Sequence, residues 1–264
     1  MFGQGDCTII RTKYNKTILI DSGEGNNDKY DYGKSVVLPY LLSHNISKID
    51  YLIISHFDSD HAGGAFYILE NLKIENIVIG FQAEKYENCV EFIKLAKEKK
   101  VNIIGLKAND ILRIDKETYF KVLFPDLSHT ISENKINNNS LVLKLVYKDF
   151  SMLFTGDIEE LGEKAILKND EKLLKSTVLK IAHHGSKTSS IEEFIAKVNP
   201  KIAVIGVGSK NNFGHPNQEV IDRLEKYKIQ IFRTDKNGGI SIYTDGYKIF
   251  CNTNYWLNHF LMLL

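Results

Sequence analysis

The chain has 264 residues, 43% of them hydrophobic, so it can bury a sizeable core, and we expect a single α/β domain over residues 1–264. Its 34 Lys and Arg nearly balance its 33 Asp and Glu, leaving a net charge of +1. This excludes a global basic field that would hold a polyanion, so any nucleic-acid contact must be local.

The N-terminal half alternates strands and helices, beginning with a hairpin. Two runs of β-branched and aliphatic residues, 7–10 and 17–21, flank the turn-like KYNK, which is the pattern of paired strands. The elements expected next are a polar loop at 24–33, a helix at 35–44, a buried strand at 51–55, a helix that begins near 62–64, a strand at 76–79, a helix at 84–99 and a strand at 101–104.

The second half begins with strand-like runs that predict antiparallel sheet, at 119–124, 141–147 and 151–155. The elements expected after them are a helix behind Thr155–Asp157, a strand at 178–182, a helix at 191–198, a strand at 201–207, a helix at 217–227 and a strand at 229–234. Two halves, each with strands first and helices covering them, predict a sandwich of two sheets flanked by helices.

Several features favour a cytoplasmic protein. The three cysteines, Cys7, Cys89 and Cys251, are odd in number and lack metal-ligand spacing, so no disulfide framework is expected. No signal peptide is visible, and no run reaches the roughly 18 to 20 apolar residues of a membrane span. The apolar tail 254–264 is expected to close the core as a helix or strand, with a membrane-surface or partner contact as the alternative.

The segment SHFDSDH follows the strand at 51–55 directly and places His56, Asp58, Asp60 and His61 within six residues. Imidazole and carboxylate groups suit Zn²⁺ and harder ions such as Mn²⁺, and crowded carboxylates repel each other unless a cation lies between them. The alternative is an exposed polar turn in which Ser59 or Asp60 caps a helix. Capping needs one such residue, so a metal site is favoured.

HFDSDH resembles the metallo-β-lactamase superfamily motif H-x-H-x-D-H, with Asp58 in place of the second histidine. The subgroup it resembles contains the ComEC-type DNA-uptake proteins and choline-phosphate esterases. Further segments resemble the soluble ComEC domain in the same order, from Gly3 to about Ile242: GQGDCTII, KTILIDSG, NNNSLVLKL, FTGDIE, LKIAHHGSKTSS and FGHPNQEV. The resemblance implies an αββα sandwich and a metal-dependent hydrolase.

The resemblance also implies a site for one or two divalent ions, Zn²⁺ or Mn²⁺. His56 and Asp58 would hold one ion, while Asp60 and His61 would hold the second or position its water. Asp157 of FTGD would bridge both, because its two oxygens can each face one cation; the alternative is a turn residue after a strand.

Other polar residues complete the expected site. Asp21 would orient the ligand loop through hydrogen bonds, or cap a turn. Alternation along a continuing strand would put His183 and His184 on opposite faces; His183 is favoured as the ligand and His184 as a supporting or substrate contact, the alternative being a hydrogen-bonded pair without metal. His215 could be a ligand, a proton donor to the leaving group, or a turn residue before Pro216.

The superfamily usually supplies one more histidine, and NNNSLVL stands in its place. Asn138 or Asn139 could bind through its amide oxygen or shape the loop, and His129 is a possible substitute. Oxygen ligands favour the harder Mn²⁺ beside Zn²⁺. The residues Ser186, Lys187, Thr188 and Ser189 could contact phosphate oxygens or cap the helix that follows. Lys210, Asn211 and Asn212 could line the substrate groove or form a solvated loop.

The expected reaction is phosphodiester hydrolysis by metal-activated water. The resemblance implies DNA as the substrate, with single-stranded DNA as one form of it. One alternative is a small phosphoester such as a choline-phosphate ester. The others are a binding module without catalysis and a di-iron redox enzyme, although no flavin-domain sequence follows. Asp58 and the missing histidine depart from the β-lactamase pattern. The sequence leaves the oligomeric state open.

Overall fold

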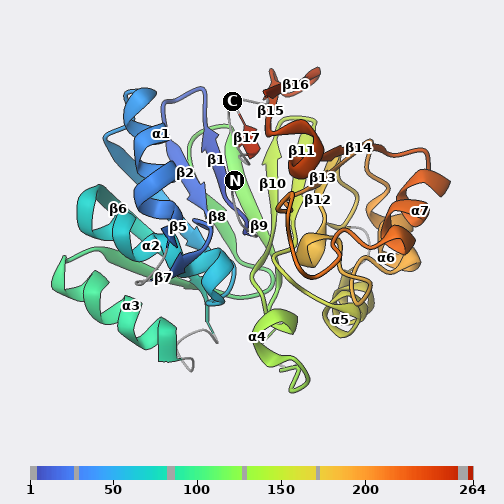
Figure 1. The fold of residues 1–264 in the computed structure, drawn as a ribbon, viewed down its shortest axis with the longest axis horizontal. Helices are drawn as coiled ribbons and strands as arrows, with labels where there is room; N and C mark the ends of the chain where they lie inside the picture. The colour runs from blue at the N-terminus through green and yellow to red at the C-terminus, as the bar shows by residue number, and fades with distance from the viewer. Residues whose placement is uncertain are drawn as a thin grey trace.

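The computed structural model describes residues 5–26, 30–81, 87–126, 130–170, 173–254 and 261–263. Two β-sheets pack face to face, and helices cover the outer face of each, as Figure 1 shows from α1–α3 on one side to α5–α7 on the other. This is the predicted αββα sandwich of two mixed sheets flanked by helices, and it arises because each sheet has one face for its partner sheet and one for helices.

The first sheet has eight strands in the order β16-β15-β17-β1-β2-β5-β6-β7. Its strands are β1 (Thr8–Arg11), β2 (Thr17–Ile20), β5 (Lys48–Ile54), β6 (Lys73–Gly80), β7 (Asn102–Leu106), β15 (Gly239–Thr244), β16 (Ile249–Asn254) and β17 (Leu261–Leu263). The predicted hairpin is the antiparallel pair β1–β2. β2, β5, β6 and β7 then run parallel, so their carboxyl ends share one edge.

The second sheet has seven strands in the order β14-β13-β12-β11-β10-β9-β8. They are β8 (Ile111–Arg113), β9 (Thr118–Phe124), β10 (Val142–Tyr147), β11 (Phe150–Phe154), β12 (Val178–Lys180), β13 (Ile202–Ile205) and β14 (Gln230–Arg233). The part from β8 to β11 is antiparallel, as predicted, and β11 to β14 are parallel.

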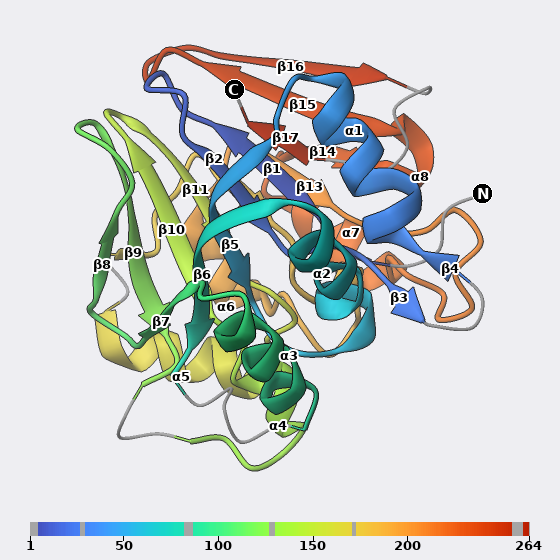
Figure 2. The same ribbon diagram turned by 90° about the vertical axis from the view of Figure 1, so that its left-hand side faces the viewer.

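Helices α1, α2 and α3 lie against the first sheet, and α5, α6 and α7 against the second (Figures 1 and 2). Their bounds are α1 (Leu38–Ser43), α2 (Ser59–Asn71), α3 (Glu87–Glu98), α5 (Glu160–Asp170), α6 (Glu192–Val198) and α7 (Gln218–Lys226), with short helices α4 (Lys135–Asn138) and α8 (Thr234–Asn237) in loops and a small sheet of β3 (Gly25–Asn26) and β4 (Tyr30–Asp31). Three buried apolar clusters fill the spaces between the four layers.

The structure departs from the predicted elements in a few places. The helix expected at 35–44 is a π-helical turn, Gly33–Val37, that continues into α1. The helix expected from 62–64 already begins at Ser59. The short β8 and the hairpin β15–β16 were not predicted. Part of the apolar tail forms β17 between β1 and β15, and none of the described helices is long and apolar enough to cross a membrane.

Two glycines explain how the start of α2 approaches the neighbouring loops. A Cβ on Gly63 would lie 2.1 Å from the backbone nitrogen of Gly25, and one on Gly64 would lie 2.5 Å from the carbonyl oxygen of Ser22. Any side chain here would push the helix away from the backbone beside it. The glycines after His61 therefore let α2 pack closely where the polar motif begins.

Candidate metal centre

The polar motifs meet because they follow strands that end at the same edge of the sandwich. SHFDSDH follows β5, and Asp21 follows the parallel neighbour β2. In the second sheet Asp157 follows β11, and the histidine pair follows the parallel neighbour β12. Loops at the carboxyl ends of parallel strands are a common place for sites in α/β proteins.

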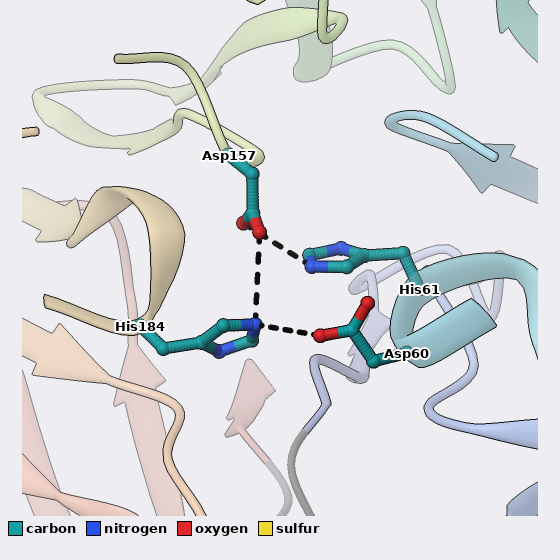
Figure 3. Close-up of side chains that lie close together, drawn as sticks. All are labelled: Asp60, His61, Asp157 and His184. Atoms are coloured by element: carbon teal, nitrogen blue, oxygen red, sulfur yellow. Dashed lines mark hydrogen bonds and ion pairs between the residues drawn. The ribbon is translucent and has the colours of Figure 1, made fainter. Parts of the chain in front are cut away.

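Four of the predicted residues converge on one point: Asp60, His61, Asp157 and His184 each offer a ligand atom, and these atoms lie within 4.8 Å of one another. Figure 3 shows His61 and His184 pointing at Asp157, with Asp60 reaching His184. The His61 Nε2–Asp157 Oδ1 and His184 Nε2–Asp60 Oδ2 distances are both 3.1 Å. His184 Nε2 lies 3.7 Å from Asp157 Oδ2.

Two further predicted residues, His56 and His183, approach the same aspartate, and Asp58 approaches His56. His56 Nε2 lies 3.9 Å from Asp157 Oδ2 and 3.7 Å from Asp58 Oδ2. His183 Nε2 also lies 3.9 Å from Asp157 Oδ2. Asp157 is therefore in reach of all four histidines, through one oxygen for His61 and through the other for His56, His183 and His184.

A buried hydrogen-bond network fixes which ring nitrogens face the centre. The Ser55 hydroxyl donates to Asp21 Oδ2 at 2.8 Å, so its oxygen accepts from His56 Nδ1 at 3.0 Å. His61 Nδ1 donates to Asp21 Oδ2 at 2.9 Å. The Nδ1 atoms thus carry the protons, and Nε2 of both rings faces Asp157. Asp21 therefore hydrogen-bonds two residues of the segment SHFDSDH, Ser55 and His61.

His184 is oriented in the same way from the other sheet. Its Nδ1 lies 2.7 Å from the carbonyl oxygen of Gly206, which can only accept, so Nδ1 donates and Nε2 faces Asp60. Beside it, the buried Lys180 and Asp6 form an ion pair of 2.5 Å, and Asp6 Oδ1 lies 3.7 Å from His184 Nδ1. This pair joins the N-terminal loop to β12.

The residues present fit a divalent cation. His56 Nε2, His61 Nε2 and Asp157 Oδ1 are buried and have no hydrogen-bond partner among the described residues, an arrangement that is costly without a cation or proton between them. Zn²⁺ binds nitrogen and oxygen at about 2.0–2.2 Å, so two ligand atoms of one ion are at most about 4.4 Å apart. The observed separations need only a small contraction.

The charges of the centre are strongly coupled. Burial alone would raise the pKa of Asp60 and of Asp157, but neighbouring histidines, His184 for Asp60 and above all His61 for Asp157, hold both pKa values below the usual range. Burial also opposes charge on His61 and His184, yet the surrounding carboxylates, Asp157 foremost, raise the pKa of each. Burial and then His61 lower the pKa of His56 to about 3.

The exposed-turn alternative for SHFDSDH does not fit the structure. His56 is 3% exposed and His61 fully buried. The residue that precedes α2 is Asp58, not Ser59 or Asp60, and its side chain makes no capping hydrogen bond with the described residues. Capping the start of α2 therefore does not explain why His56, Asp58, Asp60 and His61 stand together.

The alternation expected for the histidine pair is wrong, because β12 ends at Lys180. His183 and His184 instead both have positive φ, 48° and 53°, a region that non-glycine residues seldom adopt. His184 joins Asp60, His61 and Asp157 in the cluster described above. The His183 side chain is 24% exposed, with its Nε2 3.9 Å from Asp157 Oδ2 and its Nδ1 3.4 Å from Glu159 Oε1. Both histidines of the pair thus adjoin the centre.

The asparagine loop lies beside the centre but directs its amides elsewhere. Asn139 accepts from the Ile131 backbone nitrogen and donates to two carbonyls of its own loop. The Asn138 amide oxygen accepts from the backbone nitrogens of Glu159 and Gly162. These contacts support loop shaping, the second of the two predicted roles. His129 lies outside the described residues.

The loop after the histidine pair is also internally bonded. Ser186 is buried, and its hydroxyl lies 2.9 Å from that of Thr188, which donates to Glu159 Oε1. Lys187 is exposed. The start of α6 is held not by these hydroxyls but by Glu163, whose carboxylate accepts from the backbone nitrogens of Ser190 and Ile191 at 2.6 and 2.8 Å.

His215 lies at the outer side of the histidine pair, its ring centroid 5.8 Å from that of His183. Its Nδ1 is buried without a hydrogen-bond partner among the described residues. Burial, and then His183, lowers its pKa to about 4, so the ring is neutral near pH 7. His215 is not one of the four residues that converge around Asp157.

Sequence reasoning missed Ser55, Lys180 and Glu159. Ser55 stands inside the segment SHFDSDH and Lys180 inside an otherwise apolar strand, where a polar residue requires a buried partner. Of the three, only Lys180 could have been recognised from the sequence. A lysine within an apolar strand such as VLKIA is expected to have a buried partner of opposite charge.

Known proteins resemble the chain in both sequence and fold. Residues 1–208 match the sequence model of one protein family, the Metallo-beta-lactamase superfamily. ComE operon protein 3 of Bacillus subtilis is 36% identical over 251 residues, covering 90% of this chain and 31% of that protein. Competence protein ComA of Neisseria gonorrhoeae is 30% identical over 238 residues, covering 90% and 30%. The chain thus spans about a third of the length of these relatives.

Among solved structures, Igni18, described as a novel metallo hydrolase from the archaeon Ignicoccus hospitalis, is similar with a TM-score of 0.53. The similarity covers 96% of this chain and 97% of that one, at 11% sequence identity. At this identity the comparison bears on the fold alone, and it agrees with the αββα arrangement of Figure 1.

Proposed function

The chain belongs to the metallo-β-lactamase superfamily of metal-dependent hydrolases, and we propose that it hydrolyses phosphodiester bonds of DNA at the cluster around Asp157. The names of its relatives, a competence protein and a protein of the ComE operon, support a DNA-related substrate. The observation that carries the proposal is the convergence of Asp60, His61, Asp157 and His184 on one point.

We assign these four residues to one metal position and His56, Asp58 and His183 to a second, with Asp157 shared. The shared role is proposed because Asp157 Oδ1 lies near His61 of the first set, while Oδ2 lies near His184 of the first set and near His56 and His183 of the second. His183 would supply a further imidazole to the second position, since its Nε2 lies 3.9 Å from Asp157 Oδ2. Imidazole and carboxylate ligands of this kind suit Zn²⁺ and Mn²⁺.

When bound, divalent ions lower the pKa of a coordinated water and stabilise charge on phosphate oxygens. The chain's own residues prepare this chemistry. Asp21, Ser55 and Gly206 hold three imidazoles with Nε2 toward Asp157, so no reorientation is needed when substrate arrives. Asp60 and Asp58 are 26% and 40% exposed at their side chains, which leaves them on the side that solvent and substrate can reach.

His215 is proposed to contact the phosphate on its leaving-group side rather than to bind a metal. Its ring lies beyond His183, and with a pKa of about 4 it is neutral. A neutral imidazole can donate one hydrogen bond to a phosphate oxygen and take up a proton only when negative charge comes near. Lys187 is exposed on the neighbouring loop, and its ammonium group is proposed to attract the same phosphate.

A small phosphoester with a cationic group is the second candidate, and a groove beside the centre favours it. The groove, about 700 Å³ in volume, runs from Asp58 between α2 and α3. Aromatic Phe57, Phe66 and Tyr67 line it together with the acids Glu70, Glu91 and Glu98 and a single lysine, Lys94. Aromatic faces and carboxylates attract quaternary ammonium groups, whereas this charge repels a DNA backbone.

Turnover with defined metals tests the proposal. The purified chain, supplied with Mn²⁺ or Zn²⁺, is expected to cleave a single-stranded oligodeoxynucleotide and bis-nitrophenyl phosphate. Asp60→Ala should abolish both reactions and reduce the bound metal measured by mass spectrometry, while Asp222→Asn on exposed α7 should change neither. Equal inertness of wild type and Asp60→Ala would exclude catalysis, and turnover of nitrophenyl phosphocholine alone would favour the small ester.

A further inference from the structure

The aromatic residue Phe213 lies at the tip of the loop that carries His215. It is 69% exposed, although a phenylalanine side chain is strongly apolar and usually buried. Around the tip there is open space: a Cβ added to the next residue, Gly214, would meet nothing within 4 Å among the described residues. The ring is thus presented to solvent beside the centre.

The side chain of Asn211 bonds across the loop that presents Phe213. Its amide oxygen accepts from the backbone nitrogens of Phe213 and His215 at 3.2 and 2.9 Å. Its amide nitrogen donates to the carbonyls of Gly208 and His215 at 2.9 and 2.8 Å. All four bonds lie within residues 208–215, so they restrain the backbone that carries the exposed ring. A restrained loop loses less freedom than a flexible one when it binds a partner.

A row of rings leads from Phe213 to the metal-binding cluster. The rings of Phe213 and His215 are nearly parallel, 14° apart, with centroids separated by 5.8 Å. His215 and His183 follow at 5.8 Å, and His183 Nε2 lies 3.9 Å from Asp157. Phe213 is therefore close enough to the centre for one substrate molecule to touch both.

We propose that Phe213 stacks on an unpaired base of single-stranded DNA whose neighbouring phosphate lies at the centre. This inference rests on the proposed function. Every nucleobase has a flat π-face, and aromatic stacking platforms are the usual device for binding single strands without sequence preference. A duplex keeps its bases stacked inside, so an exposed ring of this kind selects single strands.

The charges around the loop agree with this occupant. Lys210 and Asn212, next to the ring, are exposed and polar, and Lys187 is exposed on the loop after the histidine pair. The acids that line the groove between α2 and α3 lie on other elements, the helices of the first sheet. The strand is therefore expected to approach along the loop 208–215 of the second sheet and to avoid the acidic groove.

Kinetics on matched oligonucleotides test the stacking. Phe213→Ala and Phe213→Tyr are compared with Phe250→Ala, a control in which an equally exposed phenylalanine (67%) is removed from β16. For a single-stranded oligodeoxynucleotide, Phe213→Ala should raise KM by about 5- to 150-fold, the effect of losing one base–aromatic stack. Phe213→Tyr should keep KM near wild type, and Phe250→Ala should not change it.

An oligonucleotide of the same length with abasic positions separates stacking from a loop distortion. Wild type and Phe213→Ala should differ on the normal strand and become alike on the abasic one. An equal loss on both substrates, or a KM for Phe213→Ala within twofold of wild type on the normal strand, would overturn the assignment.

Binding distinguishes this inference from the proposed function. Fluorescence anisotropy with a phosphorothioate strand and Mn²⁺ measures affinity where cleavage is slow. If wild type binds better than Phe213→Ala but cleaves no DNA, the stacking holds and the nuclease proposal fails. If wild type cleaves DNA and Phe213→Ala binds equally well, the nuclease proposal holds and the stacking fails. If the wild type neither binds nor cleaves, both fail.

Discussion

The ion pair of Asp6 and Lys180 offers a sharp test of how the centre is supported. Both side chains are almost fully buried, 8% and 7% exposed, and their charged atoms are 2.5 Å apart. Lys180→Met keeps the length of the side chain and removes its charge, which leaves the Asp6 carboxylate buried and uncompensated. Removing one partner of a buried pair costs about 3–5 kcal/mol.

For a chain of this size such a loss lowers the melting temperature by about 2–4 °C per kcal/mol, or roughly 6–20 °C in total. The double variant Asp6→Asn with Lys180→Met removes both charges and should recover most of this loss, because neither side is left with an unpaired charge. Lys164→Met, which breaks an exposed pair with Glu160, is the control and should cost less than about 1 kcal/mol.

Urea denaturation followed by circular dichroism gives the free energy of unfolding for all four proteins. If Lys180→Met loses less than Lys164→Met, or if the double variant is no more stable than Lys180→Met, the pair does not contribute as described. In that case Asp6 would hold the N-terminal loop through its backbone alone, which already bonds to Asp60 and Gly23.

Three further outcomes are expected. Ser55→Ala should weaken Mn²⁺ or Zn²⁺ binding in calorimetry by about 10- to 100-fold, because His56 and Asp21 lose the hydroxyl between them; unchanged affinity would contradict this. Gly64→Ala should destabilise the fold by about 1–3 kcal/mol, since its Cβ meets backbone at 2.5 Å, whereas Gly105→Ala, with 3.8 Å of room, should not. Burial raises the pKa of Glu163 to about 8 from 4.5, so the folded state retains a proton that the unfolded state loses, and stability should fall as pH rises through this window; in Glu163→Gln that part of the slope in chemical denaturation should vanish.

The fold and the main polar motifs could be predicted because both depend on local sequence patterns. SHFDSDH follows an apolar strand directly, and TGD follows another, so the ends of β5 and β11 were recognisable without coordinates. The αββα order followed from strands first and helices after them in each half. The short β8 was missed, since its three residues give little periodicity and Ile111 and Arg113 are exposed.

The relative placement of neighbouring residues could not be predicted, because it depends on backbone angles. His183 and His184 were expected on opposite faces of a strand, but positive φ at both turns them toward the same centre. Likewise, the roles of Asn138 and Asn139 depend on hydrogen bonds formed only in the folded loop. The sequence shows which polar side chains are present. Their hydrogen-bond partners are set by contacts between segments that are distant in the sequence.

Crowded carboxylates in residues 56–61 do not by themselves require a metal ion, because protons can balance the same charge. In the structure the pKa values of His61 and His184 are raised, while those of Asp60 and Asp157 are lowered. The neighbouring opposite charges thus favour the charged forms of both histidines and both carboxylates, and the fold holds these four side chains together. A divalent cation would compete with protons for the same ring nitrogens and carboxylate oxygens, because metal ligands must be deprotonated. The apolar layers thus determine the fold, and under the proposed function the activity would depend on the cation that these side chains bind.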